Sequence, residues 1–188
     1  MRCSVRVLSI ALFVFLNFAF FQNSSAQALK TDYQFQNTRS SSVGGAPDLV
    51  DLIHPGQSCP TYCNTFTTDT VKGEPRRVLQ FPYDNGLELQ PTTSVLGNNG
   101  VYSVAVLFKF DSQDQWRRVL EFKAGAGDTG LYIRPDNRLS FFGGGVFGPD
   151  IILAGTYVQV VLTRDSSKSV NCYLNGVFQF QFTDNTSN

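Results

Sequence analysis

The chain has few residues that could perform acid–base or nucleophilic chemistry. A glycosidase of the usual kind needs two carboxylates about 5 to 9.5 Å apart, and residues two apart on a strand share a face. The glutamates are Glu74, Glu88 and Glu121, and none has a second carboxylate two residues away. His54 is the one histidine, and the chain contains no Gly-x-Ser-x-Gly elbow. We therefore expect a protein that is not an enzyme.

The residues best suited to ligand contact surround the single tryptophan. Trp116 stands in the polar run Asp114–Arg118, which indicates a turn or a strand edge with an exposed ring. A sugar offers an apolar face and a ring of hydroxyls, so an exposed aromatic beside arginines suits it. We expect ligand contacts from Trp116, Arg117 and Arg118. The alternatives, a tryptophan that caps one end of the fold and arginines that are solvated surface, stay open.

Other aromatic and sulfur-bearing residues have simpler expected roles. Tyr132 and Phe142 are assigned to the core. Cys59 and Cys63 could close a small disulfide loop if the backbone brings them within bonding range. Cys172 lies in a strand-like run and is expected as a buried free thiol. Zinc needs about four ligands, and a chain with one histidine is a poor source of them.

The apolar pattern that must position these residues is that of short strands between turns. No long stretch shows apolar residues at helical spacing. The strands we expect span Tyr33–Phe35, Val78–Phe81, Leu87–Leu89, Tyr102–Phe110, Arg118–Lys123, Leu131–Arg134, Arg138–Phe142, Tyr157–Arg164, Val170–Leu174 and Val177–Phe182. Strands and turns at this spacing predict two packed antiparallel sheets.

Some of these segments carry more detailed predictions. Tyr102–Phe110 is apolar on most of both faces, which predicts a central, covered strand. Asn175-Gly176 is a strong hairpin signal, since both residues tolerate the positive φ of a type I′ turn. In the strand that follows we expect Phe178, Phe180 and Phe182 on one face. The glycine-rich residues 143–149 are predicted to form a flexible loop, and residues 36–76 a long excursion with a few short strands.

The N-terminus has the order of a secretion signal. Arg2 and Arg6 precede a nearly uninterrupted apolar run at residues 7–21, and small residues follow. We expect residues 1–26 to be removed, so that the mature chain begins near Gln27 or Leu29; an uncleaved anchor is the alternative. No later segment is apolar enough to span a membrane.

The mature chain is nearly neutral. Removing residues 1–26 leaves 162 residues with 13 Lys and Arg against 15 Asp and Glu, and this length fits one domain over residues 27–188. Binding to nucleic acid phosphates requires a basic footprint. We therefore exclude nucleic acid as a partner.

Two segments near the C-terminus suggest a family. The runs YVQVVLTRD at Tyr157–Asp165 and YLNGV at Tyr173–Val177 resemble the laminin G-like members of the concanavalin A-like lectin and glucanase superfamily. Further similar segments are Tyr102–Phe110, Gly130–Arg134 and Arg138–Phe142. The resemblance covers roughly Tyr33 to Phe182 and implies an all-β fold, an antiparallel jelly-roll β-sandwich of the concanavalin A-like kind.

The chain differs from the laminin G-like domains that it resembles in two respects. Many of them have Trp-x-His where this chain has Tyr157-Val158-Gln159, so a role tied to that histidine does not transfer. Such domains usually continue for several strands past the Asn-Gly hairpin, whereas six residues follow Phe182 here. We therefore expect an incomplete domain with an unpaired strand edge.

The resemblance also implies a cofactor and a function. Laminin G-like domains often hold calcium at a sandwich rim, and calcium prefers six to eight oxygen ligands. The candidates near turns are Asp128, Asp136, Asn137 and Asp165, although Asp and Asn also favour turns for backbone reasons alone. We expect a secreted or surface-displayed module that binds a glycan or an extracellular protein. A structural or adhesive module without a small ligand and a glycan-active hydrolase are the alternatives.

Overall fold

The computed structural model describes residues 28–53, 55–56, 58, 63–91, 93–96, 100–122 and 128–185. The predicted signal peptide, His54 and Cys59 lie outside the described residues. The elements are β1 Leu49–Leu52, β2 Thr65–Val71, β3 Glu74–Gln80, β4 Gly86–Leu89, α1 Thr93–Leu96, β5 Tyr102–Phe108, β6 Arg117–Glu121, β7 Gly130–Ile133, β8 Arg138–Phe142, β9 Val146–Ile151, β10 Val158–Arg164, β11 Ser169–Leu174 and β12 Val177–Thr183. No helix of this part of the chain is long and apolar enough to cross a membrane.

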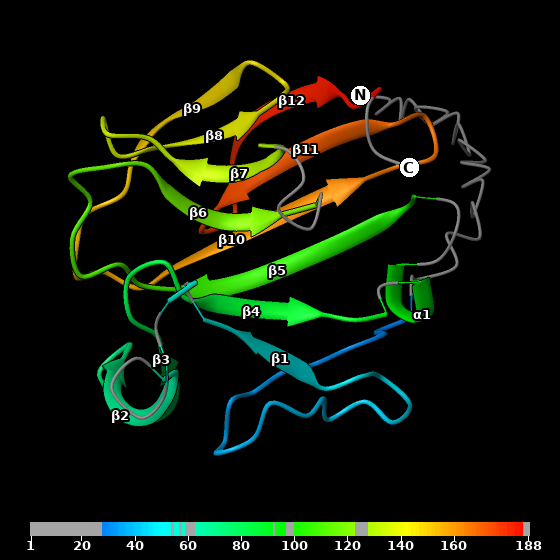
Figure 1. Ribbon diagram of the computed structural model, residues 1–188. Coiled ribbons are helices and arrows are strands. Elements are labelled where there is room, and N and C mark those ends of the chain that lie inside the picture. The colour runs from blue at the N-terminus through cyan, green and yellow to red at the C-terminus, as the bar shows by residue number, and fades with distance from the viewer. Residues whose placement is uncertain are drawn as a thin grey trace, which may run out of the picture.

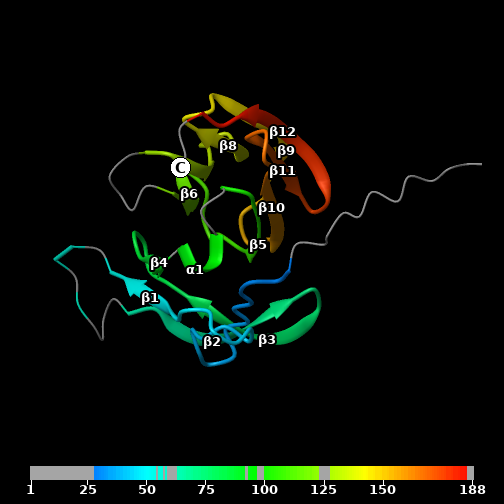
Figure 2. The ribbon, with the colours of Figure 1, turned by 90° about the vertical axis from the view of Figure 1, so that its right-hand side faces the viewer.

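Two four-stranded antiparallel sheets form the body of the fold. One has the order β12-β11-β10-β5 and the other the order β6-β7-β8-β9. Two smaller pairings, β1 with β4 and β2 with β3, account for the remaining described strands. Figure 2 shows β1 and the β2–β3 hairpin together on one side, below the two larger sheets. The all-β antiparallel architecture predicted from the strand pattern is confirmed.

The core lies between the two four-stranded sheets. Along β10, Val158, Val160 and Leu162 are buried while Gln159 between them is exposed, so one face of the strand is inside. The buried side chains that meet these residues include Leu131, Ile133, Leu139 and Phe141 of the opposite sheet and Val170, Cys172, Leu174 and Phe180 of the same sheet. Full burial of such a side chain is worth about 1.5–3 kcal/mol, so this contact between the sheets dominates the stability.

Most predicted strands are present, with ends shifted by a few residues, but β5 is not covered as predicted. It pairs with β10 at the end of its sheet in the described part of the chain. Its inner residues Tyr102 and Val104 join the core, whereas Ala105 and Leu107 are exposed on the outer face. The side chains of β5 are apolar on both faces, but other parts of the described chain cover only one of these faces.

The secondary structure of two segments, residues 33–35 and residues 146–149, was predicted wrongly. Residues 33–35 form no strand, because Phe35 takes a φ of 55° and turns the chain. Residues 146–149, placed in a flexible loop, lie in β9 Val146–Ile151 beside β8. Pro149 is compatible with this strand because β9 ends its sheet, and proline is tolerated on an edge strand.

The Asn175-Gly176 hairpin is confirmed, but the strand after it is irregular. Asn175 has a φ of 49° and Gly176 a φ of 83°, as a type I′ turn requires. A bulge then opens opposite Cys172, where the register passes from Phe178 to Phe180. The extra residue, Gln179, is buried and Phe178 is exposed. The prediction that three phenylalanines share one face was therefore wrong at Phe178.

A buried ion pair fixes the chain just after β12. Arg164 Nε donates to Asp184 Oδ2 at 3.1 Å, and Arg164 Nη1 donates to the carbonyl of Gly100 at 2.6 Å. Arg164 ends β10 on the inner face of the sheet. The pair therefore links the end of β10 to the segment that follows β12.

Candidate functional site

Three aromatic side chains gather on the outer face of the β6–β9 sheet. We call this group, Trp116, Tyr132 and Phe142, the aromatic patch. The Trp116 ring meets the rings of Tyr132 and Phe142 edge-on, with centroids at 6.1 and 6.5 Å, and Tyr132 meets Phe142 at 6.3 Å. Such edge-to-face contacts are favourable beyond simple burial. Trp116 directly precedes β6, Tyr132 lies within β7 and Phe142 ends β8, so three neighbouring strands hold the three rings in place.

The patch combines a buried floor with two exposed rings. Tyr132 lies mid-strand in β7 between Leu131 and Ile133, which face the core, and it is 6% exposed. The rings of Trp116 and Phe142 and the Arg118 guanidinium lie against it. Trp116 and Phe142 are each 48% exposed. The prediction of an exposed tryptophan is confirmed. Tyr132 is buried as predicted, whereas the assignment of Phe142 to the core was wrong.

A small polar network borders the patch. Arg118 Nε donates to the Tyr132 hydroxyl at 2.9 Å, and that hydroxyl donates to Asp128. Arg118 Nη2 also lies 3.4 Å from Asp128 Oδ1. Burial, followed by the hydrogen bond to Asp128, raises the pKa of Tyr132 to about 12. The phenol therefore stays protonated at neutral pH. The Arg118 and Asp128 side chains are half-exposed and lie at the rim of the patch.

Arg117 is directed differently from Arg118. Its guanidinium donates to the Ser112 hydroxyl at 2.9 Å and to Asp114 at 3.1 Å, and it lies 5.6 Å from the ring centroid of Tyr83. Of the three predicted contact residues, the structure brings Trp116 and Arg118 together at the patch. Arg117 binds the loop before β6 instead.

The predicted calcium ligands are distributed over three places. Asp128 precedes β7, Asp136 and Asn137 form the turn after it, and Asp165 lies in the turn between β10 and β11 of the other sheet. Among the described residues, no group of three or more His, Cys, Asp or Glu side chains is placed to share a metal ion. The four candidates therefore form no single cluster.

The carboxylates of this set already have partners within the chain. Asp136 pairs with Arg134 at 3.3 Å. Asp165 Oδ1 accepts hydrogen bonds from the Ser167 amide and hydroxyl and from the Ser169 amide, and these bonds lower the pKa of Asp165.

One oxygen of the set is buried and without a partner. Asn137 Oδ1 has no hydrogen-bond partner within the described part of the chain, but Arg134 and Arg138 stand on either side of its turn in the sequence. Positive charge there disfavours a dication. The described candidates do not fit calcium as a set.

The cysteines and glutamates are also placed by the structure. Cys63 is disulfide-bonded, while its predicted partner Cys59 lies outside the described residues. Cys172 is free and buried as predicted, and burial raises the pKa of its thiol to about 12. The glutamates lie in three different sheets: Glu74 in β3, Glu88 in β4 and Glu121 in β6.

A shallow pocket of about 300 Å³ lies on the outer face of the other sheet, and nothing in the sequence indicated it. Its lining residues are Lys72, Leu107, Tyr157, Gln159 and Asn175. Lys72 comes from the turn of the β2–β3 hairpin, where Lys72 and Gly73 have φ values of 51° and 85°. Val71-Lys72-Gly73-Glu74 is recognisable as a turn, but its position over β5 and β10 depends on tertiary contacts.

The comparison with known families agrees with this architecture. Residues 82–188 match the laminin G-like family of the concanavalin A-like lectin/glucanases superfamily. The match covers more than half of the chain, and the chain belongs to this family. The matched segment contains the whole aromatic patch but begins after the β2–β3 hairpin. The resemblance seen in the sequence extended further back, to Tyr33. No curated protein and no solved structure gives a significant match.

Proposed function

We propose that this chain is an exported, non-catalytic module that binds a glycan at the aromatic patch. The observation that carries the proposal is the pair of half-exposed rings, Trp116 and Phe142, fixed edge-on over the buried Tyr132. The family supports a lectin-like role. The order of charges and apolar residues at the N-terminus supports export to the medium or the cell surface.

The patch offers the two kinds of contact that a sugar needs. The faces and edges of Trp116 and Phe142 can pack against the C–H face of a pyranose, and Arg118 and Asp128 can bind its hydroxyls. Hydrogen bonds to charged groups contribute about 1.5–3 kcal/mol each. Because the rings are already held by Tyr132, little side-chain freedom is lost on binding, and this reduces the entropic cost of association.

Trp116 also supplies the assay, because it is the single tryptophan of the chain. A glycan array identifies candidate ligands, and the shift of Trp116 fluorescence on titration gives the affinity. We expect Phe142→Ala to weaken binding about tenfold or more. Phe178→Ala is the matched control, since Phe178 is as exposed as Phe142 but lies on the other sheet, and it should change the affinity less than twofold.

Several outcomes would contradict the proposal. If no glycan on the array binds, or if Phe142→Ala and Phe178→Ala behave alike, the patch is not a glycan site. Turnover of a polysaccharide by the full chain would establish the hydrolase alternative. A flat titration with every glycan would favour a structural or adhesive role.

An extracellular protein is the second ligand class that the patch suits. Tryptophan and arginine are enriched at the centres of protein interfaces, and Trp116 and Arg118 both lie against the ring of Tyr132. Crosslinking from the surface of the patch with Phe142→Ala as control separates this case, because a protein partner would be captured in the absence of any glycan.

Export and calcium are tested separately. Fractionation of cells that express the full chain should place the protein outside the cytoplasm with residues 1–26 removed. Calcium remains a sequence-based prediction, and titration with CaCl₂ after EDTA treatment, followed by thermal unfolding, tests it. A rise in Tm with calcium would support that prediction.

A further inference from the structure

The pocket beside the β2–β3 hairpin is a candidate for a second binding site. It lies over the outer face of β5 and β10, on the sheet opposite to the one that carries the aromatic patch. We propose that this pocket binds one ring-sized anionic group, the carboxylate- or sulfate-bearing residue of an acidic saccharide. The inference stands on the pocket itself and goes beyond the function proposed for the patch.

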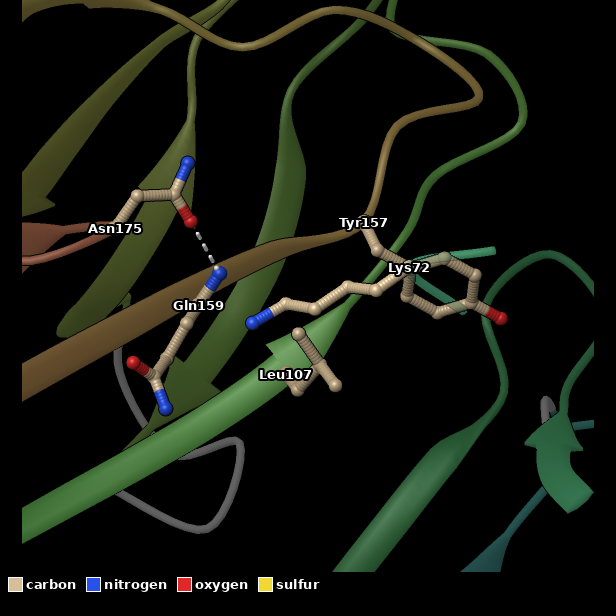
Figure 3. A pocket seen from close by; sticks show the side chains of 5 residues that line it. All are labelled: Lys72, Leu107, Tyr157, Gln159 and Asn175. Carbon is tan, nitrogen blue, oxygen red and sulfur yellow. Dashed lines mark hydrogen bonds between the residues drawn. The ribbon is translucent and has the colours of Figure 1, made fainter. Parts of the chain in front are cut away.

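The charge of the lining is the first argument. Lys72 makes no ion pair with any residue that the structure describes, and none of the five lining residues carries a carboxylate. Figure 3 shows the Lys72 ammonium group pointing toward Gln159 and Leu107. A cation without an internal partner in a concave site favours an anion as its ligand.

The hydrogen-bond donors around Lys72 are the second argument. Asn175 Oδ1 accepts from the Gln159 backbone N–H at 2.9 Å, which leaves the Asn175 Nδ2 group as a donor. The side-chain amide of Gln159 makes no hydrogen bond with the described residues. The lining therefore supplies an ammonium for an acidic group, and side-chain amides that can bind hydroxyls.

The floor of the pocket is the third argument. Leu107 is 49% exposed and lies beneath the Lys72 side chain, and the Tyr157 ring forms a wall. A volume of about 300 Å³ is at the small end of the range for ligand sites. A single saccharide ring with an apolar face and one acidic group fits both the size and the lining.

The hairpin that carries Lys72 is held in place by a charged cluster. Lys109 Nζ donates to Asp69 Oδ2 at 2.5 Å, and the Tyr157 hydroxyl donates to the same oxygen at 2.9 Å. Asp69 lies in β2, while Lys109 follows β5 and Tyr157 precedes β10. The cluster therefore ties the hairpin to the sheet and pairs Asp69, the carboxylate that contacts Tyr157 of the pocket wall, with a lysine.

The pocket belongs to this chain rather than to the family segment as a whole. The family match begins at residue 82, and both Lys72 and Asp69 precede it. The hairpin therefore adds a charged wall to a sheet face that the matched segment supplies.

The test measures binding of single sugars to the full chain by chemical-shift perturbation and calorimetry. The probes are D-glucuronate, glucose 6-sulfate, glucose and inorganic sulfate. We expect both acidic sugars to bind, with the ratio between them identifying the preferred group. Glucose should bind at least about tenfold more weakly, because a hydrogen bond to a charged group contributes more than one to a neutral group. Added salt should weaken the binding of the acidic sugars.

Two variants localise the effect. Lys72→Asn removes the charge but keeps a residue that tolerates positive φ, and it should weaken binding of glucuronate about tenfold or more. The control is Lys168→Asn, because Lys168 is an exposed lysine with a φ of 65° in another turn; it should bind as the wild type does. Gln159→Ala should weaken binding by a smaller factor.

The outcomes separate this proposal from that for the patch. Loss of glucuronate binding in Lys72→Asn with no change in Phe142→Ala supports the pocket, whatever the patch binds. Equal affinity for glucose and glucuronate, equal losses in Lys72→Asn and Lys168→Asn, or sulfate ions binding as tightly as the acidic sugars would each overturn it.

Discussion

Replacing Asp184 with asparagine should destabilise the protein far more than replacing an exposed aspartate. The side chains of Arg164 and Asp184 are 4% and 3% exposed and lie 3.1 Å apart. Asparagine keeps the shape of Asp184 but removes the negative charge that faces the buried guanidinium. Leaving one member of a buried ion pair unmatched costs about 3–5 kcal/mol, out of the about 5–15 kcal/mol that keeps a typical domain folded.

Urea unfolding followed by far-UV circular dichroism measures this difference. The control is Asp111→Asn, because the side chain of Asp111 is 78% exposed and lies 3.7 Å from Lys109; it should change the free energy of unfolding by less than about 0.5 kcal/mol. The double variant Arg164→Met with Asp184→Leu should recover part of the loss, since no unmatched charge remains. If Asp184→Asn and Asp111→Asn are equally stable, the argument from burial is refuted.

Three further predictions concern single residues. A Cβ on Gly148 would lie 2.5 Å from Gln179 Oε1, so Gly148→Ala should lower the free energy of unfolding in urea by about 1–3 kcal/mol, and by less in a Gln179→Ala background. The hydrogen bond from Lys109, and next those from Tyr157 and the Thr70 backbone, lower the pKa of Asp69 from 3.8 to about 2. Ionised Asp69 therefore stabilises the folded state fully above pH 3.8, and this contribution is lost as the pH falls through 2. Acid titrations of Tm should therefore show a gap between wild type and Asp69→Asn at pH 5 that narrows below pH 3.8 and closes below pH 2; a constant gap would contradict the assignment. The thiol of Cys172, buried and with a pKa of about 12, should react with a thiol reagent at pH 8 only after unfolding, and labelling of the native protein, read by peptide mass spectrometry, would refute its burial.

The sequence predicted the fold best where local signals and burial coincide. Residues 158–164 place Val158, Val160 and Leu162 on one face, and Asn175-Gly176 favours a tight turn, so β10 and its hairpin neighbours were predictable. β9 was missed because Gly148 and Pro149 are poor strand residues on their own. Gly148 is there because Gln179 lies close against it, and that contact joins strands far apart in the sequence.

The candidate site was predictable only in part, for a similar reason. Trp116 and Arg118 were identified from residue type and polar context. Phe142 was assigned to the core because local sequence does not show that the last residue of β8 faces outward, next to a tryptophan that precedes β6. The pocket depends on Asp69 pairing with Lys109, forty residues away, and no local pattern encodes that contact.

The bulge at Gln179 also affects the tendency of the molecule to aggregate through the edge of β9. The Gln179 amide donates to Asp150 Oδ2 at 2.7 Å, while its oxygen accepts the Asp150 backbone N–H at 3.3 Å. Asp150 lies in β9, which ends its sheet among the described strands and packs against β12. A strand edge with free backbone groups invites pairing with another chain and aggregation. By occupying one of the backbone donors of β9, Gln179 makes that edge a poorer template for a neighbouring molecule.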